Sequence, residues 1–347
     1  MEQRIRFYGS ALVLLSGFLC VGGPNRASAA AGCPQQTASN SLAFKSGRNG
    51  DVGVAPSGFI QPSDSSPVVN GIDVSKYQTD PIFAGVRHCG GAFAYIRLSA
   101  GTDENNELAY RTFWANAKSA GLLTGPYHHL TLADAKSAVH QLGKADLDAL
   151  IERNKLQSIA QARMFKERLT ELLSYDPLAD QVPRTYGGPY LPAALDVTET
   201  PQAKYAQADQ KQFSPIYGAA ICAWVKEFRS DDRFKDQPVI LFTKPVIFGD
   251  YQLANAPCDL SQLKVWISYH GRTGDRPQTE TNPVARKAIE DLCVTSNQEN
   301  RCLFEQYTSY GGFAVFSAGA GLDLDRYVGT LDSLKSMLQR AQAGPSK

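Results

Sequence analysis

Short apolar runs alternate with helical patterns along most of the chain. The runs are nearly continuous in apolar residues, as expected for strands buried on both faces; they fall at residues 68–74, 92–98, 122–128, 191–197, 239–243, 263–268, 302–307 and 313–316. Between them, apolar residues recur at helical spacing, as at Ala109, Phe113, Ala117 and Ala120. Strands and helices in series predict a parallel sheet, and about eight such strands predict its closure into a barrel.

The expected fold is therefore α/β, a TIM-like β/α barrel over residues 69–340 whose late strands can be irregular and antiparallel. Residues 132–180 carry a polar helical pattern that is longer than a barrel crossover needs, so we expect a helical insertion there. Residues 30–68 are rich in Ser, Gly, Pro, Asn and Gln, which predicts a disordered linker.

Residues 1–29 predict a secretory signal peptide. Arg4 and Arg6 precede an apolar run at residues 11–21, and Ala27-Ser28-Ala29 offers a cleavage site. The run is shorter than the roughly 20 residues that span a bilayer, so no membrane span is expected. An uncleaved anchor and a lipoprotein attached through Cys33 are the alternatives to export into the periplasm or the medium.

The net charge and the spacing of cysteines and histidines limit the kinds of partner and cofactor that we expect. The net charge is +1, and signal cleavage, which removes three arginines and one glutamate, leaves it near −1. No basic patch favours nucleic acid, no Cys-x-x-Cys or His-x-x-x-His spacing predicts a metal, and we expect no cofactor and a monomer.

Six cysteines remain after signal cleavage, an even number that is compatible with disulfides in an exported chain. Cys293 and Cys302 flank a polar loop and are expected to pair. For Cys89 and Cys222 the alternative is a buried, unpaired apolar residue.

Acidic residues stand beside several strands. Asp73 ends the first strand and Asp196 the fourth, while Asp323 and Asp325 follow the last. Reactive groups of β/α barrels lie at the carboxyl ends of the strands, and an Asp after an apolar run is costly to bury unless it is paired or solvated. Each alone could be a helix cap or turn former; together they favour a site.

Aromatic residues near strand ends could stack on sugar rings. The candidates are Tyr77, Tyr127, Tyr307, Tyr269 and Trp266. Core packing is the alternative, and it is preferred for Trp266, which lies in the middle of a strand. The neighbouring His128 and His129 must point to opposite sides of their strand, so at most one faces a site.

Ordered segments of the chain resemble glycoside hydrolase family 25, the Chalaropsis-type lysozymes. Gly71–Gln78 is similar to the family's opening Gly-Ile-Asp-Val-Ser signature, and Leu322–Tyr327 resembles its closing Val-Asp-x-Asn-x-aromatic. Further similar segments lie at residues 93–97, 100–102, 121–128, 195–197, 238–243 and 305–307. The resemblance implies a barrel that cleaves the β-1,4 bond between N-acetylmuramic acid and N-acetylglucosamine in peptidoglycan, with Asp73, Asp196 and Asp323 at the family's acidic positions.

Two positions depart from the family pattern. Thr198 stands where the family has its general-acid Glu, and Ala100 where it usually has another Glu. A hydroxyl is a poor acid near neutral pH, so Glu199 or an Asp323 of raised pKa is the candidate replacement. We expect an exported muramidase; the alternative is a catalytically impaired glycan-binding protein on the same barrel, with Thr198 among its glycan contacts.

Overall fold

The structure is a computed structural model that describes residues 33, 59, 67–78, 83–105, 107–132, 142–174, 189–198, 207–250, 253–268, 287, 290, 292–293, 300–311 and 322–339. The predicted signal peptide and most of the predicted linker lie outside these residues. So do Glu199, Tyr269 and the strand expected at residues 313–316.

Eight strands close into a barrel in the order β1 to β8. Their bounds are β1 Val68–Val74, β2 Gly91–Ala100, β3 Leu123–His129, β4 Ala193–Val197, β5 Val239–Thr243, β6 Lys264–Ser268, β7 Cys302–Gly311 and β8 Leu322–Val328. The first seven run parallel, whereas β8 is antiparallel to both β1 and β7. The predicted barrel is confirmed, including an antiparallel late strand.

The position of β8 corrects one expectation. Asp323 and Asp325 were expected to follow the last strand, but both lie within β8. Because β8 runs against its neighbours, its first residues lie beside the carboxyl ends of the parallel strands: Asp323 is the direct partner of Asp73.

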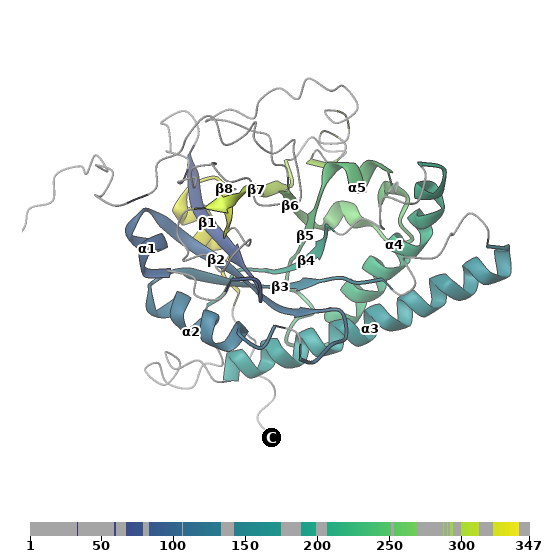
Figure 1. Cartoon of the computed structure of the whole chain (residues 1–347), viewed down its shortest axis with the longest axis horizontal. Coiled ribbons are helices and arrows are strands. Elements are labelled where there is room, and N and C mark those ends of the chain that lie inside the picture. The colour runs from purple at the N-terminus through teal and green to yellow at the C-terminus, as the bar shows by residue number, and fades with distance from the viewer. Residues whose placement is uncertain are drawn as a thin grey trace, which may run out of the picture.

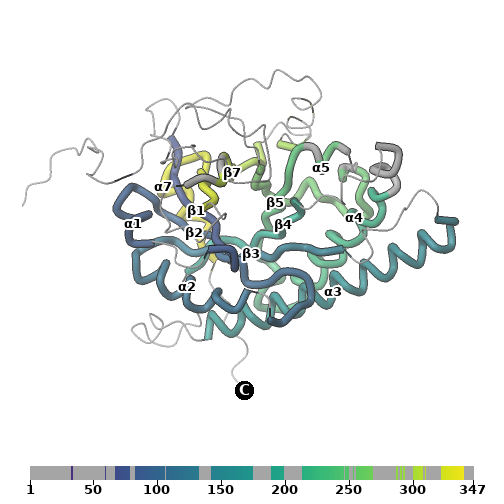
Figure 2. Tube along the Cα trace, viewed as in Figure 1, coloured from purple at the N-terminus to yellow at the C-terminus, as the bar shows by residue number. Residues whose placement is uncertain are grey.

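Helices surround the strands (Figure 1). Their bounds are α1 Phe83–His88, α2 Tyr110–Ser119, α3 Lys144–Ser174, α4 Gln207–Phe228, α5 Pro245–Asp250 and α7 Leu331–Ser336, with 3-10 helices at Leu253–Asn255 and Leu260–Gln262. The long α3 lies within the segment predicted as an insertion; it runs along one side of the molecule and packs on α4 (Figures 1 and 2). None of the helices described here combines the length and the apolar character needed to cross a membrane.

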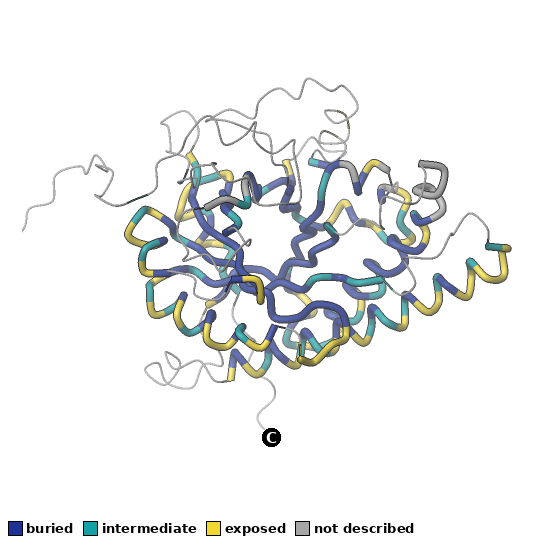
Figure 3. Tube along the Cα trace, viewed as in Figure 1, coloured by how far each residue is buried: buried dark blue, intermediate teal, exposed yellow. Residues whose placement is uncertain are grey.

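The two faces of the strands contribute to two separate apolar layers. The strands are buried almost throughout, while α3 alternates between buried and exposed positions (Figure 3). One apolar layer lies between strands and helices and includes Ile96, Leu98, Leu195, Phe165, Leu169 and Trp224. A second fills the barrel interior with Phe93, Tyr95, Tyr127, Phe242, Trp266 and Phe304.

Aromatic rings pack the interior closely, so the barrel is filled and not hollow. The ring centroids of Phe242 and Trp266 are 4.1 Å apart and those of Tyr95 and Trp266 4.7 Å apart. Glycine is required where these rings press on the backbone: a Cβ on Gly125 would come within 2.4 Å of the Tyr95 ring. Trp266 is fully buried, as preferred from its mid-strand position.

Three disulfides join the six cysteines that follow the predicted signal peptide: Cys33–Cys89, Cys222–Cys258 and Cys293–Cys302. The pairing expected for Cys293 and Cys302 is confirmed. The alternative that Cys89 and Cys222 are unpaired apolar residues is wrong, because each has a partner from a distant segment that the linear sequence could not identify.

Candidate active site

Four aspartates on three strands form an acidic cluster inside the barrel, which we define as Asp73, Asp196, Asp323 and Asp325. Asp73 lies near the end of β1, Asp196 near the end of β4, and the other two at the start of β8. Along each strand the aspartates are separated by an even number of residues from a residue of the barrel interior, Val69 on β1, Ala194 on β4 and Tyr327 on β8, so their side chains face the interior as well. Three elements far apart in the sequence thus bring their carboxyls to one end of the barrel.

Asp196 is held as a carboxylate by hydrogen-bond donors on both oxygens. Its Oδ1 accepts from the Thr198 hydroxyl at 2.5 Å and the Thr198 amide at 3.0 Å, and its Oδ2 lies 2.8 Å from Nδ1 of His129. Burial alone would raise the pKa of Asp196, but His129, Thr198 and the charge of Arg97 outweigh it and hold the pKa below its ordinary value. Asp196 is therefore ionised at neutral pH.

Asp73 has neutral donors and carboxyl neighbours. The Tyr127 hydroxyl donates to Oδ1 at 3.1 Å, and Nε2 of Gln306 donates to Oδ2 at 2.8 Å. Burial and the nearby charge of Asp196 raise the pKa of Asp73 to about 6, although the hydrogen bonds lower it in part. Asp73 therefore titrates near pH 6.

Asp323 is half-buried and faces Asp73 directly across the antiparallel pair of β1 and β8. Cβ atoms of opposite residues in such a pair lie about 5 Å apart. Burial, then the charges of Asp73 and Asp196, raise the pKa of Asp323 well above its ordinary value. One end of the barrel therefore carries a carboxyl with a raised pKa, Asp323, and one with a lowered pKa, Asp196.

Glu107 orients a buried arginine beside the cluster. Its Oε1 accepts from Nε and Nη2 of Arg97 at 2.7 and 2.6 Å, and its Oε2 accepts from the Lys76 amide at 2.6 Å. Glu107 is buried and has φ +66°, which side-chain-bearing residues adopt only at a cost. The Arg97 guanidinium lies 5.3 Å from the ring centroid of Tyr77, whose side chain is 59% exposed.

The structure brings most of the predicted site residues together. Tyr127 contacts Asp73, which pairs with Asp323, and Thr198 contacts Asp196, whose charge acts on both of the other aspartates. Tyr77 lies on Arg97. Tyr127 was expected to stack on a sugar ring. It is buried, and its hydroxyl is hydrogen-bonded to the Asp73 carboxyl. Ala100 is buried and pairs with His129 in the sheet.

Tyr307 is the exception among the described candidates. Phe304 and Gln306 of β7 face the interior, so Tyr307 faces the opposite side, and it packs in the layer between strands and helices. That position does not fit the expected contact with a sugar. The fourth catalytic candidate, Glu199, lies outside the described residues.

The adjacent histidines point apart, as their alternation predicted. His129 faces Asp196, while His128 is fully buried on the helix side, between the Ser99 hydroxyl at 2.7 Å and Oε1 of Gln161 at 2.9 Å. Sequence reasoning missed His129, Arg97 and Gln306 as site residues. The signal for His129 was available, because one histidine of the pair had to face inward.

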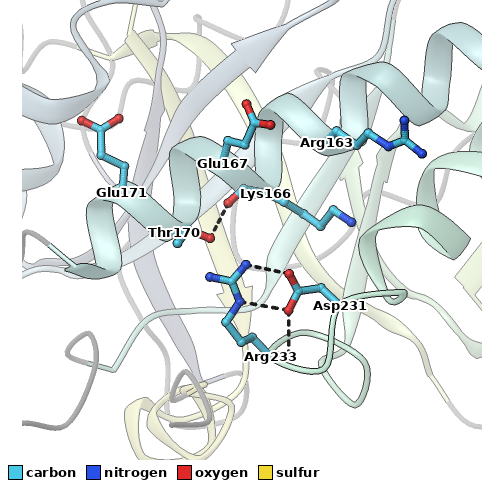
Figure 4. Close-up of a pocket in the computed structure, with 7 residues that line it drawn as sticks. All are labelled: Arg163, Lys166, Glu167, Thr170, Glu171, Asp231 and Arg233. Atoms are coloured by element: carbon cyan, nitrogen blue, oxygen red, sulfur yellow. Dashed lines mark hydrogen bonds and ion pairs between the residues drawn. The ribbon is translucent and has the colours of Figure 1, made fainter. Parts of the chain in front are cut away.

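No site residue predicted from the sequence lines the pocket of about 500 Å³ that lies between α3 and the segment after α4. Arg233 pairs with Asp231 within the pocket (Figure 4). Lys166 and Arg163 pair with Glu227, which is not among the residues that line it. Within the described residues, no group of three or more His, Cys, Asp or Glu side chains is placed to hold a metal ion.

Sequence comparison links the first strands to a known family. Residues 72–143 match the model of glycosyl hydrolases family 25, and the match ends one residue before α3 begins. Lysozyme M1 of Streptomyces globisporus is 38% identical over 69 residues, which are 20% of this chain and 23% of that protein. The chain thus spans less than a quarter of this curated relative in the aligned region. The resemblance to family 25 predicted from the sequence is confirmed.

Solved structures with similar folds include two lysozymes. One is the bacterial lysozyme of Streptomyces coelicolor, 18% identical with a TM-score of 0.46, over 78% of this chain and 96% of that one. The other is the family GH25 lysozyme of Aspergillus fumigatus, 16% identical with a TM-score of 0.48, over 78% and 99%. The assignment of a barrel fold rests on the strand pairing described above.

Proposed function

The protein is related to glycoside hydrolase family 25, and we propose that it is a muramidase that hydrolyses the β-1,4 bond between N-acetylmuramic acid and N-acetylglucosamine in peptidoglycan. One observation carries the proposal: the acidic cluster places Asp196, which hydrogen-bond donors hold as a carboxylate, in one site with Asp323, whose pKa is raised by burial and by neighbouring carboxyls. Glycoside hydrolysis needs this combination, because one carboxyl protonates the leaving oxygen while a carboxylate attacks or activates water. The relationship to lysozyme M1 supports the choice of substrate.

Asp323 takes the role of the general acid in this proposal. Thr198, which stands where the family's acid Glu is expected, donates its hydroxyl to Asp196 and so supports the carboxylate. Asp323 is less buried than Asp73, and its pKa is raised well above the ordinary value by burial and by the charges of Asp73 and Asp196, which suits it to carry the proton for the leaving oxygen. Asp196 is the ionised partner, and Asp73 keeps the proton on Asp323 through its own charge.

Tyr77 is the proposed sugar contact. Its ring is exposed and backed by the Arg97 guanidinium, an arrangement that leaves an aromatic face open to solvent beside the cluster. Rings of this kind supply contact area with little loss of conformational freedom. Tyr127 and Thr198 act on the glycan indirectly, by holding Asp73 and Asp196.

A glycan-binding protein without hydrolytic activity is the second candidate. Thr198 favours it, because the side chain at this position satisfies Asp196 and cannot donate a proton to a leaving group near neutral pH. Binding would need only the exposed ring of Tyr77 and the hydrogen-bonding groups around it.

Incubation of the protein with purified peptidoglycan, followed by mass spectrometry of the soluble products, separates the two functions. A muramidase releases muropeptides with reducing N-acetylmuramic acid, and Asp196→Asn and Asp323→Asn both abolish the release. Lys235→Ala, an exposed change remote from the cluster, is the control. Binding to the insoluble wall without release by the wild type would refute hydrolysis and support the binding protein.

Export is part of the proposal. The three disulfides support it, because such bonds persist in oxidising compartments, and residues 1–29 carry the signal-peptide pattern, with residues 30–68 as a linker. N-terminal sequencing of the protein from its producing cells should begin at residue 30. An intact residue 1 on a protein that stays in the cell would contradict export.

A further inference from the structure

Asp325 lies deeper in the barrel than the other members of the acidic cluster. It is fully buried, and it pairs with Gln306 of β7 and Gly71 of β1 in the sheet. Its Oδ1 accepts a hydrogen bond of 3.0 Å from Nε1 of Trp266. Because Trp266 is packed between aromatic rings, the position of this carboxyl is fixed.

Nothing described in the structure neutralises a charge on Asp325. No ion pair joins it to a lysine, arginine or histidine of the described residues, and its Oδ2 is buried and meets no donor there. Its nearest charged neighbours are carboxyls, Asp73 and Asp323. A buried carboxylate with such surroundings is strongly unfavourable, so the group keeps its proton.

Asp73 is the carboxyl placed to accept the proton of Asp325. In the pair of β1 and β8, Asp325 lies opposite Gly71 and Asp73 lies opposite Asp323, so the two inward-facing carboxyls are diagonal neighbours, and the two oxygens of Asp73 already accept from Tyr127 and Gln306. In the same arrangement Oε1 of Gln306 accepts from the Ser268 hydroxyl at 2.8 Å while its Nε2 donates to Asp73. Asp73 is thus surrounded by donors, which is the environment of an ionised carboxylate.

We propose that Asp325 is an un-ionised carboxylic acid that donates its proton in a hydrogen bond to Asp73 and thereby holds Asp73 as a carboxylate. Asp325 is a positioning residue, since it is buried behind Asp73. Burial and the charges of Asp73 and Asp323 raise the pKa of Asp325 well above its ordinary value, in agreement with this assignment. The titratable or polar groups that face the pair from the surrounding strands are Tyr95, Tyr127, Asp196, Trp266, Gln306 and Asp323.

The consequence for catalysis rests on the proposed function. An ionised Asp73 opposite Asp323 keeps the proton on Asp323, which is the proposed general acid. Without the hydrogen bond from Asp325, Asp73 would hold its own proton at higher pH, and the charge that raises the pKa of Asp323 would be lost. Asp325 would thus determine the lower pH limit of the reaction, by keeping Asp73 ionised.

Infrared spectroscopy of the protein with ¹³C-labelled aspartate tests the assignment without measuring activity. At pH 7 the wild type should show carbonyl bands of un-ionised carboxylic acids. Asp325→Asn should remove one band, and Asp323→Asn should remove the other as the matched control. The absence of such bands from the wild type, or an unchanged spectrum for Asp325→Asn, would overturn the proposal.

A ¹³C NMR titration of Asp73 supplies the second measurement. Asp325→Asn keeps a donor and should leave the pKa of Asp73 near 6, whereas Asp325→Leu removes it and should raise that pKa by about one unit or more. Equal pKa values in all three proteins would contradict the hydrogen bond. Both measurements stand apart from muropeptide release, so a failed proposal about Asp325 and a failed proposal of function give different results.

Discussion

Replacing Thr198 with Val tests how the cluster keeps Asp196 ionised. The change preserves the shape of the side chain and removes the hydroxyl that lies 2.5 Å from Oδ1 of Asp196, while the backbone donor at 3.0 Å remains. A hydrogen bond to a charged group contributes about 1.5–3 kcal/mol. Since one pKa unit corresponds to about 1.4 kcal/mol, the pKa of Asp196 should rise by about one to two units.

The sign of the pH dependence follows from the lowered pKa. Asp196 contributes stability above its unfolded pKa, and this contribution is lost as the pH falls through the folded value. Thr198→Val should therefore lower the free energy of unfolding by about 1.5–3 kcal/mol at pH 7. The difference from wild type should shrink as the pH falls through the pKa of Asp196 in the variant and then through its lower value in the wild type, because the carboxyl is then protonated in both proteins.

Urea unfolding at pH 7 and pH 4, with a ¹³C NMR titration of Asp196, provides the assay. Thr198→Ser is the control, because it keeps the hydroxyl and should leave the pKa close to the wild-type value. An equal loss of stability at both pH values would refute the reasoning, as would a Thr198→Ser protein in which the pKa of Asp196 rises as far as in Thr198→Val.

Three further outcomes follow from the fold. Removal of the Cys222–Cys258 disulfide, whose cysteines are 36 residues apart, should lower the free energy of unfolding by about 4 kcal/mol. Removal of Cys293–Cys302, whose cysteines are 9 residues apart, should lower it by about 2.5 kcal/mol. Urea unfolding measures both losses, and the reverse order would contradict the dependence on loop length. Gly125→Ala should lower the thermal midpoint through about 1–3 kcal/mol of overpacking against Tyr95, and an unchanged midpoint would mean that the ring can move. Burial lowers the pKa of His128 to about 3, so the free energy of unfolding should fall as the pH is lowered from about 6.5 towards 3, by up to about 1.4 kcal/mol per pH unit. His128→Gln should reduce this slope in urea unfolding. An equal slope in the variant would mean that other groups cause the pH dependence.

The strands that sequence reasoning located well are those buried on both faces. β1 and β5 have the predicted bounds; β5 is an unbroken apolar run that ends at Thr243, which leaves little choice. β8 was missed as a strand because Asp323, Asp325 and Arg326 interrupt its apolar pattern. Those charges are tolerated by contacts from other strands, such as the ion pair of Arg326 with Glu305 at 2.7 Å, which the linear sequence does not reveal.

The members of the site could be predicted, but their contacts could not. Asp73 and Asp196 follow from the rule that reactive groups lie at strand ends. The bond between His129 and Asp196 depends on the register of β3 against β4, in which these two residues are direct partners. Tyr307 was misplaced because both faces of β7 carry aromatic residues, so alternation could not show which side faces the interior.

The pairing of β1 with β8 also has a consequence for how the chain folds. The barrel closes through its first and last strands, from Val68 opposite Val328 to Asp73 opposite Asp323, and the amide of Gly329 reaches the carbonyl of Pro67. Contacts of such large sequence separation form slowly. A growing or truncated chain that lacks β8 would expose the unpaired edges of β1 and β7, which are templates for association with other chains. Completion of β8 is therefore what converts an open, association-prone sheet into a closed one.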